Sequence, residues 1–126
     1  MEREASKILI VDDEEAILFA FSRVLGGPGR EIHSAETLSA ALQLLRGNSY
    51  RAVIADLKLS GTSNNEGHEV IRAVRSTQKE CRIIVMTAYG DEKTKEKVSS
   101  MGIDLYLEKP VSPLKVKEML SSMGIL

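Results

Sequence analysis

Short apolar runs and stretches with helical periodicity alternate five times along this chain, and this alternation restricts its fold more than any other feature. A short apolar run is typical of a buried strand, and apolar residues three and four positions apart are typical of an amphipathic helix. Units of one strand and one helix fold with right-handed crossovers into a parallel sheet with helices on both faces. We therefore predict a doubly wound α/β fold with a five-stranded parallel sheet.

The boundaries follow from where each pattern starts and stops. The predicted strands are residues 7–11, 31–35, 52–56, 82–87 and 104–108, and the predicted helices are residues 14–25, 37–46, 68–76, 91–101 and a last one from about residue 112. The second strand is the weakest, so we place it near the sheet edge. The fourth helix has only Val98 and Met101 as clearly apolar residues and should be among the least stable elements.

The length and net charge of the chain limit the classes of protein to which it can belong. The 126 residues fit one domain, residues 1–126, with a core of about 6–124. The 17 Lys+Arg and 18 Asp+Glu give a formal net charge of −1 and no overall attraction to nucleic acid or membrane. A lone Cys81, a charged start at Met1–Glu4 and no long apolar run predict a cytoplasmic protein without a signal peptide or membrane span.

Polar side chains stand at the ends of four predicted strands. Asp12 and Asp13 follow the first, Asp56 ends the third, Thr87 ends the fourth, and Lys109 follows the fifth. The carboxyl ends of parallel strands meet at one edge of a sheet, where open α/β sheets bind ligands, so we expect these side chains to converge. Carboxylates suit Mg²⁺, while a hydroxyl and an ammonium group suit a phosphoryl group. The pattern predicts a cation site beside a phosphoryl site.

Each of these residues alone also has an ordinary structural interpretation. Asp12 or Asp13 would cap the first helix and Asp56 the loop after its strand, because aspartate is a favoured cap. Thr87 is a typical strand residue, and Lys109 alone would be a solvated lysine. We favour a functional interpretation because the whole set occurs on the expected strands.

Three other polar residues carry weaker signals. Tyr106 lies in the fifth predicted strand, where a half-buried aromatic residue is common. His33 and His68 are isolated, and neither has a partner pattern that indicates general base catalysis. Without a Cys/His cluster, a zinc site is not expected.

Four segments together closely resemble the receiver domain of bacterial two-component response regulators. They are residues 8–14, 53–57, 84–88 and 102–110, and their order and spacing extend the resemblance over essentially the whole chain. The resemblance implies a flavodoxin-like three-layer sandwich with strand order 2-1-3-4-5. It also implies a phosphoprotein that works in a phosphorelay.

The resemblance assigns a role to each strand-end residue. Asp56 would accept a phosphoryl group from a sensor histidine kinase or a phosphotransfer protein. Mg²⁺, with Mn²⁺ as the alternative cation, would be bound by Asp12, Asp13, Asp56 and the backbone carbonyl of Lys58. Thr87 and Lys109 would hold the phosphoryl oxygens.

The output implied by the resemblance is a change in a binding surface. Thr87 and Tyr106 would switch the face of the fourth helix, fifth strand and fifth helix toward a downstream effector protein or domain. We expect Tyr106 to exchange a solvated hydroxyl for a buried ring. The protein would be a monomer or a weak phosphorylation-dependent dimer without direct nucleic acid or membrane contacts. It would not be an enzyme in the usual sense, although its acyl phosphate would hydrolyse.

Two departures from the family pattern fall in the loop after Asp56. Ser60 stands where the family usually has proline, and the glycine that usually opens the next helix is about three residues late, at Gly67. We therefore expect residues 60–66 to form a longer, mobile loop.

Two other functions remain as alternatives. One is a receiver-like interaction module that is never phosphorylated, which the altered loop favours and the intact acidic set disfavours. The other is a phosphohydrolase of the haloacid-dehalogenase type, which would need a second aspartate two residues after its nucleophile. The segment Asp12–Glu14 lacks that aspartate, and we expect no cap domain. The chain is either a stand-alone regulator or part of a longer one.

Overall fold

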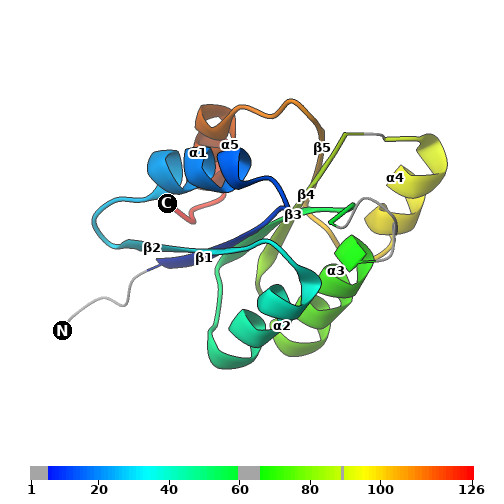
Figure 1. Cartoon of the computed structure of the whole chain (residues 1–126), viewed down its shortest axis with the longest axis horizontal. Helices are drawn as coiled ribbons and strands as arrows, with labels where there is room; N and C mark the ends of the chain where they lie inside the picture. Colours follow the sequence, from blue (N-terminus) through cyan, green and yellow to red (C-terminus); the bar gives the residue numbers. More distant parts are fainter. Residues whose placement is uncertain (1–5, 60–65, 89) are drawn as a thin grey trace.

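The computed structural model describes residues 6–59, 66–88 and 90–126, and within these ranges five parallel strands form one sheet (Figure 1). The strand order is β2-β1-β3-β4-β5, as in flavodoxin-like folds. The strands are β1 (Ser6–Val11), β2 (Arg30–Ala35), β3 (Ala52–Asp56), β4 (Arg82–Thr87) and β5 (Leu105–Glu108). The helices are α1 (Glu15–Leu25), α2 (Leu38–Gly47), α3 (Glu66–Thr77), α4 (Glu92–Ser99) and α5 (Pro113–Ser122). The predicted fold class is confirmed, and β2 lies at a sheet edge as predicted.

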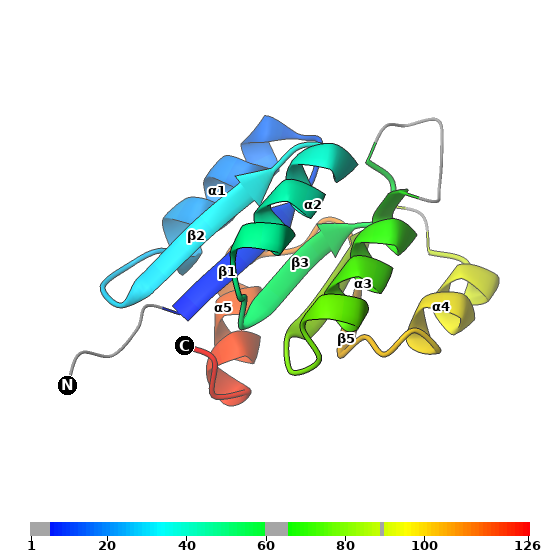
Figure 2. The same ribbon diagram turned by 90° about the horizontal axis from the view of Figure 1, so that it is seen from below.

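Helices cover both faces of the sheet, which makes three layers. α1 and α5 lie on one face, and α2, α3 and α4 lie on the other (Figures 1 and 2). Successive side chains of a strand point to opposite faces, so the central strands must be apolar at every position. In β1, Ile8 and Ile10 pack with α1 and α5, whereas Leu9 and Val11 pack with α2 and α3. This explains why the sequence shows continuous apolar runs.

The start of α3 differs from the predicted start at residue 68. The helix begins at Glu66, so Gly67 lies within its first turn. A Cβ atom on Gly67 would lie 2.5 Å from the carbonyl oxygen of Leu57, which shows that the helix approaches the end of β3 closely. Gly67 therefore lets α3 start against the strand. The predicted mobile loop covered residues 60–66: residues 60–65 lie outside the described residues, and Glu66 belongs to α3 and not to a loop.

The end of α4 also differs from the prediction, because the helix stops at Ser99 instead of residue 101. Met101 donates its N–H to Val98 in a tighter turn, and Gly102 then adopts a φ of +84°. Glycine adopts this left-handed conformation without steric cost, so the chain can leave the helix here. Within α4 only Val98 is buried, as the polar sequence of this helix predicted.

The remaining features of the fold concern the start of α5 and the lengths of the helices. Ser112 caps α5 by accepting a hydrogen bond from the N–H of Lys115, as the sequence predicted. Among the described residues, no helix is long and apolar enough to cross a lipid bilayer.

Candidate functional site

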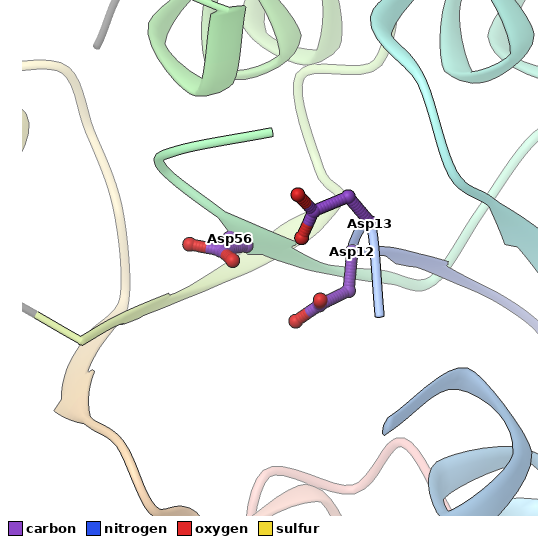
Figure 3. A group of neighbouring side chains, drawn as sticks. All are labelled: Asp12, Asp13 and Asp56. Carbon is purple, nitrogen blue, oxygen red and sulfur yellow. The ribbon is translucent and has the colours of Figure 1, made fainter. Parts of the chain in front are cut away.

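Three carboxylates meet where β1 and β3 end. The two strands are neighbours in register, with Val11 opposite Ala55, so Asp12 and Asp56 leave the sheet side by side. Asp12, Asp13 and Asp56 can each offer a carboxylate oxygen, and these atoms lie within 4.8 Å of one another (Figure 3). The predicted convergence of the acidic residues is therefore present in the structure.

Lys109 joins the two buried carboxylates of this cluster. Its Nζ lies 2.8 Å from Oδ2 of Asp12 and 2.9 Å from Oδ2 of Asp56. A third acid, Glu14, lies 3.6 Å from the same nitrogen and is exposed. Asp12 is fully buried and the side chain of Lys109 is only 12% exposed, so these charges interact with little screening by water. Lys109 is thus a structural partner of the acids and not a solvated lysine.

Burial and charge act in opposite directions on the pKa values of these groups. Burial raises the pKa of both Asp12 and Asp56 above the ordinary range, although hydrogen bonds from Lys109 oppose this rise. Burial alone would lower the pKa of Lys109, but its hydrogen bonds to Asp12 and Asp56 outweigh burial and raise it. Lys109 is therefore charged at neutral pH. Because several acids share this one buried ammonium group, a further cation would stabilise their ionised forms.

Local backbone bonds orient both buried aspartates. Oδ1 of Asp12 accepts the N–H of Glu14 at 2.9 Å, and Oδ1 of Asp56 accepts the N–H of Lys58 at 3.1 Å. Each carboxylate thus uses one oxygen locally and turns the other toward Lys109. Neither Asp12 nor Asp13 is the N-cap of α1, which is Glu14 without a side-chain cap bond. The capping interpretation is wrong for α1, whereas the local bond made by Asp56 coexists with its place in the cluster.

Thr87 and Lys109 stand on the adjoining strands. Thr87 ends β4 and is 4% exposed, and its carbonyl accepts the N–H of Lys109 at 2.8 Å. This bond continues the β4–β5 ladder by one residue and places Lys109 beside the site. The Lys109–Pro110 peptide bond is cis. All the side chains predicted at the strand ends thus lie at one edge of the sheet.

A cleft of about 410 Å³ opens over this edge. It is lined by Asp13, Glu14, Asp56, Leu57, Lys58, His68, Thr87, Ala88, Asp91, Thr94 and Lys109. Six of these residues were not predicted as site residues: Glu14, Leu57, His68, Ala88, Asp91 and Thr94. A signal for Asp91 was present, because an aspartate three residues before a threonine at a helix start indicates a cap. His68 gave no such signal, because its position depends on how closely α3 approaches β3.

Tyr106 differs from the sequence-based expectation of a solvated hydroxyl. Its ring packs on the α2–α3–α4 side of the sheet, and its buried hydroxyl has no hydrogen-bond partner among the described residues. A Cβ atom on Gly90 would lie 2.6 Å from that hydroxyl, so Gly90 covers it. Burial raises the pKa of Tyr106, and Glu108 and Asp91 add to the rise.

The two histidines are not isolated in the structure. Nδ1 of His33 lies 2.7 Å from the hydroxyl of Tyr50, and its Nε2 lies 3.2 Å from Glu31. This group lies on β2 and before β3, and neither His33 nor Tyr50 lines the cleft. Burial raises the pKa of Tyr50 to about 12, so its hydroxyl keeps its proton at neutral pH. His68 is 4% exposed and lines the cleft, so the prediction that both histidines are isolated is wrong.

A second hollow, larger than the cleft, lies away from this site. It has a volume of about 1030 Å³ and is lined by residues near the starts of β3, β4 and β5. Its central cation, Arg75, donates to the carbonyl oxygens of Gly102 and Cys81 and pairs with Asp104. These bonds tie α3 to the loops around it, so the arginine has a structural role. The clustered acids and Lys109 lie at the carboxyl ends of the strands instead.

Comparison with known proteins identifies the family. Residues 8–121 match the model of the response regulator receiver domain, which covers most of the chain. The chain belongs to the response regulator receiver domain family. It is therefore a domain of two-component signalling, and phosphorelay is the general function of the family.

Similar proteins support the same assignment. The receiver domain is 32% identical over 117 residues to the photosynthetic apparatus regulatory protein RegA of Rhodobacter capsulatus, which covers 93% of this chain and 62% of RegA. It thus spans less than two thirds of that relative. A CheY-like receiver domain protein from Methanospirillum hungatei superposes with a TM-score of 0.83 at 26% identity, covering 95% and 94% of the two chains. The DrrB receiver domain of Thermotoga maritima, solved in a BeF3-activated form, gives 0.82 at 25%, covering 95% and 97%.

The acidic cluster fits the cation that receiver domains generally bind at an acidic pocket, Mg²⁺. Mg²⁺ is a hard cation that takes oxygen ligands and keeps several waters, so two or three carboxylates suffice. The oxygens of Asp12, Asp13 and Asp56 are close enough to share one ion. The donor set of this receiver domain is therefore all oxygen, as Mg²⁺ requires.

Proposed function

We propose that Asp56 is the phosphoacceptor and takes its phosphoryl group from a phosphohistidine of a sensor histidine kinase or a phosphotransfer protein. The observation that carries the proposal is the position of Lys109, whose Nζ bridges Asp12 and Asp56 in the floor of the cleft. An ammonium group that is bound to the acceptor carboxylate can stabilise the negative charge of the phosphoryl group during its transfer from donor to acceptor. The BeF3-activated structure of the DrrB receiver domain supports the proposal, because that domain matches 95% of this chain.

The transfer needs positioning and charge compensation more than covalent help. An oxygen of Asp56 forms a bond to phosphorus as the bond between phosphorus and the donor nitrogen breaks, and that electron pair stays on the histidine. Lys109 and the Thr87 hydroxyl hold the phosphoryl oxygens. Asp12, Asp13, Asp56 and the carbonyl of Lys58 would hold Mg²⁺, which when bound neutralises charge on the phosphoryl oxygens.

The local bonds of Asp56 indicate which of its oxygens reacts. Oδ1 is held by the backbone N–H of Lys58, whereas Oδ2 is held by the side-chain ammonium group of Lys109. We infer that Oδ2 accepts the phosphoryl group and that Lys109 then moves onto a phosphoryl oxygen. The backbone bond to Oδ1 keeps the carboxyl group in its orientation during the reaction.

We also propose that phosphorylation changes the α4–β5–α5 face, which a downstream effector then recognises. Because the Tyr106 hydroxyl is already buried without a partner among the described residues, the change cannot consist of burying a solvated hydroxyl. Movement of Thr87 toward the phosphoryl group would instead release the segment that covers this hydroxyl. The protein would remain a monomer or form a weak dimer on phosphorylation, and water would end the signal by hydrolysing the acyl phosphate. It is thus a self-phosphorylating phosphoacceptor that also dephosphorylates itself, and not an enzyme in the usual sense.

Intact mass spectrometry after incubation with Mg²⁺ and acetyl phosphate tests the phosphoacceptor assignment. We expect the wild type to gain one phosphate and Asp56→Asn to gain none. Glu36→Gln is a matched control, because Glu36 also follows a strand end at the same edge but does not line the cleft. Equal phosphate gain by wild type and Asp56→Asn would refute the assignment.

A further inference from the structure

Asp91 links α4 to the phosphoacceptor cleft. It is the N-cap of α4, and its Oδ1 accepts the N–H of Thr94 at 2.7 Å. Asp91 and Thr94 also line the cleft that contains Asp56. The bond from Thr94 lowers the pKa of Asp91, so its carboxylate is charged at neutral pH. A negatively charged residue thus lines the same cleft in which a phosphoryl group on Asp56 would add more negative charge.

The same cap lies next to Tyr106. Gly90, which precedes Asp91, covers the Tyr106 hydroxyl so closely that a Cβ atom would lie 2.6 Å from it. Asp91 is also one of the acids whose charge raises the pKa of Tyr106. The segment from Gly90 to Asp91 therefore contacts both the cleft and the tyrosine of the α4–β5–α5 face.

α4 has little besides its cap to hold its first turn. The helix spans eight residues and buries only Val98, which lies in its last turn. Residues 92–94, in its first turn, are not buried. Capping bonds stabilise helix starts, and their effect is largest where tertiary packing is weak. A force on Asp91 therefore acts on the least anchored part of the helix.

We propose that the Asp91 carboxylate weakens phosphoryl binding at Asp56 while it caps α4, and that phosphorylation in turn loosens the first turn of α4. The inference rests on the proposed role of Asp56 and names how that site is regulated. A phosphoryl group carries more negative charge than the carboxylate it modifies and lies farther out in the cleft. Next to an aspartate, that charge is destabilising. The displaced cap is Asp91, and its neighbour Gly90 covers the hydroxyl of Tyr106.

Phosphoryl binding at Asp56 and loss of the α4 cap must affect each other reciprocally. If phosphorylation favours the uncapped state of α4 by a given factor, the capped state weakens phosphoryl binding by the same factor. The N-terminus of α4 by itself would attract an anion, but Asp91 already occupies that position. Removing only its charge should therefore strengthen phosphoryl binding, provided that the cap bond is kept.

Beryllofluoride titration followed by NMR tests this inference in wild type, Asp91→Asn and Asp91→Ser with Mg²⁺ present. Asparagine and serine cap helices about as well as aspartate, so both variants remove the charge and keep the cap. We expect both to bind beryllofluoride about two- to fivefold more tightly, the size of a charge effect at a helix start. Glu92→Gln is the control, because Glu92 lies in the same turn but does not line the cleft.

Hydrogen exchange of the α4 amides gives a second readout. In the wild type, beryllofluoride should speed exchange at residues 94–96, and in Asp91→Asn this increase should be smaller. Equal affinities and equal exchange in Asp91→Asn and Glu92→Gln, with normal binding by the wild type, would overturn this inference alone. If the wild type bound no beryllofluoride, the proposed role of Asp56 would fail and this inference would fail with it.

Discussion

Lys109 donates a hydrogen bond to Asp56, with Nζ 2.9 Å from Oδ2, although the two residues are 53 positions apart in the sequence. The bond exists because β3 and β5 both flank β4 and end at the same edge of the sheet. The same nitrogen lies 2.8 Å from Oδ2 of Asp12, the residue that follows β1. One side chain thus ties together the ends of strands from across the sheet and compensates charge where the proposed reaction adds more.

Replacing Lys109 should slow phosphorylation more than it changes the fold. Lys109→Met keeps the long apolar stem but removes the only buried cation of the cluster among the described residues. We expect the rate of phosphorylation by acetyl phosphate to fall by about 100-fold, as when one preorganised charge-stabilising group is removed. Intact mass measured against time gives the rate. Lys115→Met, at an exposed position of α5, is the control. A rate near that of the wild type would show that Lys109 does not stabilise the transferred group.

Stability without metal should depend on pH through the buried carboxyl groups. The pKa of Asp56 is raised above its ordinary 3.8, mainly by burial, so the folded state holds this proton more tightly than the unfolded state. Its contribution to stability is complete below the ordinary pKa and is lost as pH rises through the folded-state pKa. Urea unfolding should therefore show Asp56→Asn gaining stability relative to the wild type as pH rises from about 4 to 7. A constant difference over that range would contradict the raised pKa.

Asp13 should contribute more to Mg²⁺ binding than its neighbour Glu14. Both acids are exposed, but only Asp13 belongs to the group of carboxylates whose oxygens lie within 4.8 Å. We expect Asp13→Ala to weaken Mg²⁺ about tenfold or more and Glu14→Ala by less than about threefold, because a direct ligand loses more electrostatic energy. NMR titration of each variant measures the two affinities. Equal losses would remove Asp13 from the ligand set.

Gly90 should be intolerant of a side chain because of Tyr106. The Cβ atom of Gly90→Ala would lie 2.6 Å from the tyrosine hydroxyl, so the ring or the segment must move. We expect a loss of about 1–3 kcal/mol in unfolding free energy, as for overpacking elsewhere. Gly47→Ala, whose Cβ would meet nothing within 4 Å, should not destabilise the protein. Shifted Tyr106 ring signals in Gly90→Ala would confirm the contact, and unchanged signals and stability would contradict it.

The distal effect of phosphorylation should concentrate between Asp91 and Glu108. This range contains α4, which buries only Val98, and β5, which carries Tyr106. Hydrogen exchange with and without beryllofluoride should show the largest changes there, outside the cleft itself. Larger distal changes on α1 and α2 would show that the output uses another face and that Tyr106 is only a strand residue.

The sequence predicted the fold and the strand-end residues because both depend on local patterns. A central parallel strand is buried on both faces, so β1 and β3 appear as apolar runs that end in acids. Parallel pairing then brings Asp12 and Asp56 together without further information. The start of α3 and the end of α4 do not follow from such patterns. Gly67 lets α3 begin close to the backbone of Leu57, and Gly102 ends the turn after α4 in a left-handed conformation.

The features of the site that the sequence did not predict depend on tertiary contacts. His68 reaches the cleft only because Gly67 lets α3 pack against the backbone of Leu57. The Tyr106 hydroxyl is buried because Gly90 covers it, and no periodicity in β5 reports that contact. Asp91 is recognisable as a cap, but its place in the cleft depends on how the segment after β4 turns.

The most direct test of the central claim is to locate the acyl phosphate on the chain. Borohydride reduces an aspartyl phosphate to homoserine, which peptide mass spectrometry can assign to one position. After phosphorylation with Mg²⁺ and acetyl phosphate, followed by borohydride, we expect homoserine at position 56 and at no other aspartate. Homoserine at position 12 or 13, or its absence from position 56 in a phosphorylated sample, would contradict the account.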